Sequence, residues 1–183
     1  MSFSPIPKFS FPDLTDVTPD FLCRLGVKFL MLDLDNTIAA YNEDTPSPAV
    51  EKWANDVKQR GIELYIVSNS LRKKRVGAFE QQLGIGVIMN AQKPSPTGVY
   101  QAMEAAGYSA GSSAFIGDQI FTDTLAANRA GVVSIIVKPK QFTNPFLALR
   151  FACETPFRAM CKNINRSGNS PGVSRTARQN NKI

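Results

Sequence analysis

Short apolar runs, each the length of one β-strand, constrain the fold of this chain more than any other feature of its sequence. Uninterrupted runs of this kind are typical of strands buried on both faces of a parallel sheet. The segments between them carry apolar residues at helical spacing, as in Val50, Trp53 and Val57. Strand and helix alternate, which predicts a three-layer, Rossmann-like α/β fold with helices on both faces of a parallel sheet of about five strands. The expected strands are residues 27–34, 62–67, 86–89, 113–116 and 132–137.

The absence of histidine limits the chemistry that this chain can perform. None of the 183 residues is a histidine, which excludes catalytic triads that use histidine and metal sites that use imidazole ligands. Catalysis would therefore depend on carboxylates, hydroxyls, lysine and a hard metal ion.

The apolar runs are also far shorter than the roughly 20 residues that a membrane-spanning helix needs. We therefore expect a cytoplasmic protein.

Polar residues follow four of the predicted strands. The carboxyl ends of parallel strands meet at one edge of a sheet, where ligands bind in folds of this class. Two carboxylates at positions i and i+2 repel each other and favour a cation such as Mg²⁺. A carboxylate can also attack phosphorus, while hydroxyl groups and lysine hold phosphoryl oxygens. The residues are Asp33 and Asp35, Ser68 and Asn69, Lys93, and Asp118 and Asp123.

These residues belong to four segments that occur in a fixed order along the chain: Asp33-Leu34-Asp35-Asn36-Thr37, Ser68, Lys93, and Gly117-Asp118-(x)4-Asp123. The set resembles the four motifs of the haloacid dehalogenase (HAD) superfamily of phosphatases, and the resemblance covers about residues 27–140. The sequences of these motifs, LDLDNTI, IVSNS, KPSP and GDQIFTD, are similar to those of the subfamily IIIA, YqeG-like phosphatases. Those in turn are similar to the phosphatidylglycerophosphate phosphatases of mitochondria and plastids.

The resemblance implies a role for each residue that would meet the substrate. Asp33 would be the nucleophile, and Asp35 the general acid and base. Ser68 and the amide of Asn69 would bind the phosphoryl oxygens. Lys93 would steady both the nucleophile and the phosphate. The reaction implied is hydrolysis of a phosphomonoester through an aspartyl-phosphate intermediate.

The resemblance also implies a Mg²⁺ site. Asp33 would bind the metal through its carboxylate and Asp35 through its backbone carbonyl. Asp118 would be a direct ligand. Asp123 would either support the direct ligands or reach the metal through water.

The spacing of the motifs leaves no room for a cap domain. Thirty residues separate Thr37 from Ser68, and twenty-four separate Ser68 from Lys93. Capped members of the superfamily enclose small metabolites, so by analogy an open site suits a phosphate on a lipid or a macromolecule. Phosphatidylglycerophosphate is the leading substrate hypothesis.

The flanking segments differ from the core, which we place at residues 27–140. Residues 1–26 are rich in proline and phenylalanine and are expected to pack on the core in extended form. Residues 141–162 form an amphipathic segment that contacts either the core or a lipid surface. Residues 163–183 are predicted to be a disordered basic tail. The entire excess charge of +6 lies after Glu154. The tail is therefore either solvated, aiding solubility, or attracted to anionic lipid headgroups or RNA.

A second hypothesis is a binding or regulatory protein on the same scaffold, with the basic tail contacting RNA, a ribosome or a protein. The clustered carboxylates count against it, because a scaffold without catalysis has no need to gather them around one cation. Among partners, peripheral contact with an anionic membrane at its inner face is the preferred hypothesis, and nucleic acid is the less favoured one. The basic run at residues 72–75 has two interpretations: it contacts an anionic substrate, or it is a solvated helix face without a function. The oligomeric state is left open.

Overall fold

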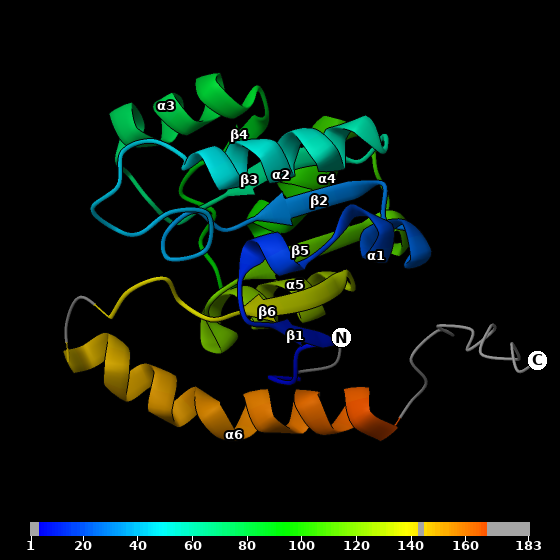
Figure 1. The fold of residues 1–183 in the computed structure, drawn as a ribbon, viewed down its shortest axis with the longest axis vertical. Coiled ribbons are helices and arrows are strands. Elements are labelled where there is room, and N and C mark those ends of the chain that lie inside the picture. Colours follow the sequence, from blue (N-terminus) through cyan, green and yellow to red (C-terminus); the bar gives the residue numbers. More distant parts are fainter. Residues whose placement is uncertain (1–3, 143–144, 168–183) are drawn as a thin grey trace, which may run out of the picture.

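The computed structural model describes residues 4–142 and 145–167, which form a parallel sheet covered by helices. In the described part of the chain the sheet has six strands in the order β1-β6-β5-β2-β3-β4 (Figure 1). The predicted α/β architecture is therefore confirmed. The strands are β1 (Phe9–Phe11), β2 (Phe29–Leu32), β3 (Glu63–Val67), β4 (Gly86–Ile88), β5 (Ser113–Gly117) and β6 (Val133–Val137).

Helices lie on both faces of the sheet (Figure 1). Apolar side chains of α1, α2 and α3 fill one core with the sheet, and those of α4 and α5 fill the other. The central strand β2 is buried along its whole length because it lies between β3 and β5. The α-helices are α1 (Pro19–Arg24), α2 (Pro48–Gln59), α3 (Lys73–Leu83), α4 (Thr97–Ala106), α5 (Leu125–Ala130) and α6 (Pro145–Ser167).

The sixth strand corrects the expected strand count. Strand β1 comes from the N-terminal segment and pairs in parallel with β6, with Phe9 opposite Ile135. It is only three residues long, and its central Ser10 interrupts the apolar run. A strand this short at the edge of a sheet gives too weak a pattern to be recognised.

The N-terminal segment is also less extended than expected. Helix α1 begins at Pro19, where Thr18 caps it by accepting a hydrogen bond from the backbone N–H of Phe21 (3.2 Å). A capping threonine followed by proline is a favourable helix start. Leu14 and Leu22 are fully buried, so the segment is part of the core on that face.

The stretches between the motifs hold single helices and strands. Between Thr37 and Ser68 the chain forms α2 and β3, and between Ser68 and Lys93 it forms α3 and β4. Within residues 37–93, all of which the structure describes, there is no cap domain.

Helix α6 runs along the β1 edge of the sheet (Figure 1). It continues through Pro156 to Ser167, so residues 163–167 of the predicted tail are helical. The rest of that tail, residues 168–183, lies outside the described residues. A search of the described helices finds none with the length and apolar character needed to cross a membrane.

Candidate active site

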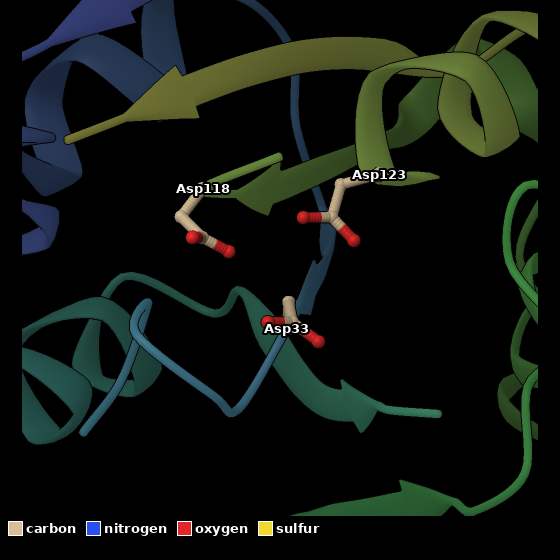
Figure 2. Close-up of side chains that lie close together, drawn as sticks. All are labelled: Asp33, Asp118 and Asp123. Carbon is tan, nitrogen blue, oxygen red and sulfur yellow. The ribbon is translucent and has the colours of Figure 1, made fainter. Parts of the chain in front are cut away.

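Three aspartates meet at the carboxyl edge of the sheet. Oxygen atoms of Asp33, Asp118 and Asp123 all lie within 4.8 Å of one another, and all three residues are buried. Asp33 follows β2, Asp118 follows β5, and Asp123 lies in the helical turn Ile120–Thr124 (η3). Figure 2 shows the three carboxylates around a common space. The fold thus brings Asp33 together with two predicted site residues that lie far from it in the sequence.

The backbone positions these acids through the sheet and one obligatory glycine. The N–H of Asp33 donates to the carbonyl of Ile116 (2.9 Å), which extends the pairing of β2 with β5 by one residue. At Gly117, an added Cβ would lie 2.3 Å from Oδ2 of Asp123. Only a residue without a side chain lets Asp123 approach this closely. The same Oδ2 accepts a hydrogen bond from the backbone N–H of Gln119 (3.0 Å).

Lys93 joins two of the three aspartates. Its Nζ lies 2.6 Å from Oδ1 of Asp33 and 2.8 Å from Oδ1 of Asp123. Burial alone would lower the pKa of Lys93, but these two carboxylates outweigh that effect and hold the pKa above its usual value. The buried side chain is therefore a cation at neutral pH.

Burial has the opposite effect on the acids, because it disfavours the charged form of a carboxyl group. It raises the pKa of Asp33 from its usual 3.8 to about 7, with Lys93 opposing the rise and Asp123 adding to it. Burial also raises the pKa of Asp118, and repulsion from Asp123 and Asp33 raises it further. In the protein without a metal, these acids therefore resist ionisation.

The donor set fits a hard divalent cation. Oδ1 of Asp118 is buried and has no hydrogen-bond partner among the described residues. If all three carboxyl groups are ionised, as ligands of a metal must be, one lysine leaves two negative charges uncompensated, and Mg²⁺ prefers oxygen ligands of this kind. A divalent cation at this position would balance the charge and give that oxygen a partner.

The phosphate-binding candidates lie at the ends of neighbouring strands. Ser68 follows β3 and is buried, with its Oγ accepting from the N–H of Ser70 (3.1 Å). The side chain of Asn69 binds both peptide groups of Lys93. Its Oδ1 accepts from the Lys93 N–H and its Nδ2 donates to the Lys93 carbonyl, both at 2.9 Å. The side chain of Asn69 therefore positions Lys93, which the sequence did not indicate.

The carboxylate of Asp35 is not part of the three-aspartate cluster. Its Oδ1 accepts a hydrogen bond from Arg75 of α3 at 2.6 Å. The same guanidinium donates to the carbonyl groups of Glu43 (2.7 Å) and Ala40 (3.0 Å). Arg75 thus connects α3 to Asp35 and to the loop that follows it.

Arg75 is a site residue whose role the sequence analysis missed. Its side chain is buried, so this member of the basic run 72–75 is not on a solvated helix face. The position of Arg75 on α3, relative to the apolar residues of that helix, could have indicated that it is buried. Arg75 adjoins the buried stripe of Val76 and Phe79, and its guanidinium lies 5.3 Å from the centre of the Phe79 ring.

The fold and the acid cluster define a hydrolase of the haloacid dehalogenase type. The chain belongs to the haloacid dehalogenase-like hydrolase family, whose model matches residues 13–131. The predicted family is therefore confirmed, and the chain is a HAD-type phosphatase.

The chain is also similar in sequence to individual phosphatases of this family. It is 33% identical over 147 residues to "Probable phosphatase YqeG" of Bacillus subtilis (strain 168), a match covering 78% of this chain and 85% of that protein. It is 29% identical over 143 residues to "Phosphatidylglycerophosphate phosphatase 1, chloroplastic" of Chlamydomonas reinhardtii, a match covering 73% of this chain. The chain spans only 53% of the length of that algal relative.

A solved structure shares the fold. The 3-deoxy-D-manno-octulosonate 8-phosphate phosphatase from Yersinia pestis superposes with a TM-score of 0.50. The match covers 81% of this chain and 89% of that one at 13% identity. At this level of identity the likeness concerns the fold alone.

Proposed function

We propose that this chain is a Mg²⁺-dependent phosphomonoesterase that forms an aspartyl-phosphate on Asp33. The observation that carries the proposal is the buried cluster of Asp33, Asp118 and Asp123 with Lys93 between two of its members. Oδ1 of Asp33 is held by Lys93, while Oδ2 has only a long contact to the hydroxyl of Thr37 (3.5 Å). Oδ2 is therefore the oxygen we assign to the attack on phosphorus.

The reaction has two steps, each at phosphorus. In the first, Asp33 forms a bond to phosphorus, the ester P–O bond breaks, and Asp35 gives a proton to the leaving oxygen. In the second, water attacks phosphorus while Asp35 takes a proton from it, and the bond to Asp33 breaks to release phosphate. Ser68 and the backbone N–H of Asn69 hold the phosphoryl oxygens, and Lys93 offsets their negative charge.

Asp33, Asp118 and the backbone carbonyl of Asp35 would hold Mg²⁺, which stabilises negative charge on the transferring phosphoryl group. Asp123 has a different task. Both of its oxygens already accept hydrogen bonds, from Lys93 and from the N–H of Gln119. We therefore assign Asp123 to holding Lys93 and the turn after β5 rather than to direct metal binding.

Phosphatidylglycerophosphate is the substrate we propose. Two observations support it: the site has no cap domain over it within residues 37–93, and relatives carry the name of that activity. Exposed Phe142, Phe146 and Leu149 lie at and just before the start of α6 and provide apolar contacts for a lipid surface. We propose peripheral contact with an anionic membrane through this region.

The test is phosphate release from phosphatidylglycerophosphate in mixed micelles beside a small generic phosphomonoester, with Mg²⁺ or EDTA. The expected result is Mg²⁺-dependent release from the lipid, abolished in Asp33→Asn and retained in Asp56→Asn, which changes an exposed aspartate on α2. Phosphate release from the generic ester alone would support the phosphomonoesterase reaction but contradict phosphatidylglycerophosphate as the substrate. No release from either would favour a binding role for the scaffold.

Sedimentation with vesicles tests the membrane contact separately. The chain should sediment with vesicles containing phosphatidylglycerol and less so when Phe146 and Leu149 are both changed to serine. Equal sedimentation of the two proteins would contradict contact through α6, whatever the substrate is.

A further inference from the structure

Helix α6 buries a pair of charged residues beside apolar ones, among them Cys161, which is fully buried, and Phe157, whose ring contacts that of Phe121. Glu154 is 1% exposed and Arg158 is 6% exposed, and they form an ion pair (3.2 Å). Phe146 and Leu149 on the same helix are exposed. Burying an ion pair is costly unless further hydrogen bonds satisfy both partners. Nε of Arg158 has no hydrogen-bond partner among the described residues, so the pair is satisfied only in part. The groups that contact its other polar atoms indicate its purpose.

Most of those groups belong to the segment that follows β5. The carboxylate of Glu154 accepts hydrogen bonds from the backbone N–H groups of Ile120 (2.9 Å) and Phe121 (3.4 Å). The guanidinium of Arg158 donates to the carbonyl of Asp118 and to that of Val137 at the end of β6 (2.9 Å). Two side chains of α6 thus hold the backbone on both sides of Gln119.

A third side chain of α6 extends the same contact. Arg150 donates to Oε1 of Gln119 at 2.7 Å. The backbone N–H of Gln119 in turn donates to Asp123, which binds Lys93. Side chains of α6 therefore contact each residue from 118 to 121, the segment that carries one acid of the cluster and supports another.

This matters most for Asp118. Its Oδ1 has no hydrogen-bond partner among the described residues, so no hydrogen bond at that oxygen fixes the carboxylate and the hold on its backbone gains weight. The backbone carbonyl of Asp118 is held by Arg158. Groups that orient metal ligands in this way typically affect metal affinity about 10- to 100-fold when they are changed.

We infer that Glu154 and Arg158 are positioning residues of the active site, which fix Asp118 in the geometry needed to bind a divalent cation. The helix that carries them lies outside residues 13–131, where the family model matches. This chain thus completes its metal site with a C-terminal element. The inference rests on the proposed function for one assignment, that of Asp118 as a metal ligand.

The experiment is a calorimetric titration of the full chain with Mg²⁺ alone, so that its readout does not depend on activity. Arg158→Met should bind Mg²⁺ at least about tenfold more weakly than the wild type. Arg158→Lys should recover part of the loss. An ammonium group can donate to the Asp118 carbonyl but cannot reach all the acceptors that the guanidinium binds. Glu154→Gln should be intermediate, since its amide oxygen can still accept from Ile120.

Two controls separate positioning from simple stabilisation. Met160→Ala removes an exposed side chain of α6 and should leave Mg²⁺ affinity unchanged. The melting temperature of every variant is measured in EDTA to confirm folding. If Arg158→Met does not fold, Arg158→Lys and Glu154→Gln, which keep the side-chain volume, decide the question.

Unchanged Mg²⁺ affinity in folded variants at Arg158 and Glu154, with or without a lower melting temperature, would overturn the inference and leave both as structural residues. The wild type and Asp118→Asn are titrated alongside. A wild type that does not bind Mg²⁺, or an Asp118→Asn variant that binds it equally well, would overturn the metal assignment in the proposed function and with it this inference.

Discussion

The ammonium group of Lys93 lies within 2.8 Å of carboxylate oxygens of both Asp33 and Asp123. One buried cation is thus shared by two buried carboxyl groups that come from widely separated parts of the sequence. Coulombic attraction of this kind is strong because little water screens it. The stability of the site and the orientation of Asp33 therefore depend on the same side chain.

Replacing Lys93 should affect both folding and activity. Lys93→Met leaves two buried carboxylates without their cation, and breaking a buried pair in this way costs about 3–5 kcal/mol. Urea unfolding in EDTA should show this loss, and phosphatase activity should fall below detection. Lys52→Met, which breaks an exposed pair with Asp56, should cost less than about 1 kcal/mol and keep full activity. Equal stability of the two variants would contradict the importance of the buried pair.

Gly117 should tolerate no side chain. In Gly117→Ala the new Cβ would meet the carboxylate of Asp123, which must move and take Lys93 with it. We expect activity to fall about 100-fold, as for loss of a group that stabilises charge in the transition state. Gly111→Ala is the matched control, because an added Cβ there meets nothing within 4 Å. Near-normal activity in Gly117→Ala would show that Asp123 does not need its present position.

Arg75 should support catalysis without touching the phosphate. In Arg75→Met, Asp35 loses its 2.6 Å partner and the carbonyl groups of Ala40 and Glu43 lose their donor. We expect kcat to fall at least about tenfold, because general acid–base catalysis depends on the position of the carboxyl group. Arg75→Lys should recover little of it, since one ammonium cannot reach three separated acceptors.

Lys74→Met is the control for Arg75, because it removes an exposed positive charge from the adjacent position. Its kcat should match the wild type. An increase in KM without a change in kcat for Arg75→Met would contradict a role through Asp35 and would instead favour substrate binding by the basic run.

The raised pKa of Asp33 predicts how the stability of the metal-free protein depends on pH. Its pKa is 3.8 ordinarily and about 7 in the folded chain, so between these values the folded state holds more protons than the unfolded state. Stability in EDTA should therefore fall as the pH rises from about 4 to about 7. The slope should be smaller in Asp33→Asn, which cannot ionise at this position.

Unfolding by urea at a series of pH values, with EDTA or with excess Mg²⁺, measures this dependence. Mg²⁺ favours the ionised acids and should stabilise the protein increasingly as the pH rises through the same range. Stability in EDTA that is constant or rises over this range would show that Asp33 ionises normally in the folded protein.

The sequence predicted the layers of the fold because buried strands and amphipathic helices leave strong periodic patterns. It also predicted which acids meet, since Asp33 and Asp118 follow strands whose carboxyl ends share an edge. Strand β1 escaped recognition because three residues with a serine at the centre make too short a pattern.

The supporting contacts could not be predicted in the same way. Arg75 and Arg158 donate to backbone carbonyl groups far away in the chain, and no sequence pattern specifies which backbone group a charge will meet. The side chain of Asn69 likewise binds the peptide groups of Lys93. These contacts depend on the packing of helices on the sheet, which the order of residues does not reveal by itself.

The most direct test of the proposed chemistry is to look for phosphate on Asp33. The wild type would be mixed with Mg²⁺ and a phosphomonoester, quenched rapidly in acid, and examined by mass spectrometry of its peptides. The predicted result is a phosphorylated Asp33 that is absent without Mg²⁺ and absent in Asp33→Asn. Phosphate release by the wild type without phosphorylated Asp33, or continued release by Asp33→Asn, would contradict Asp33 as the nucleophile.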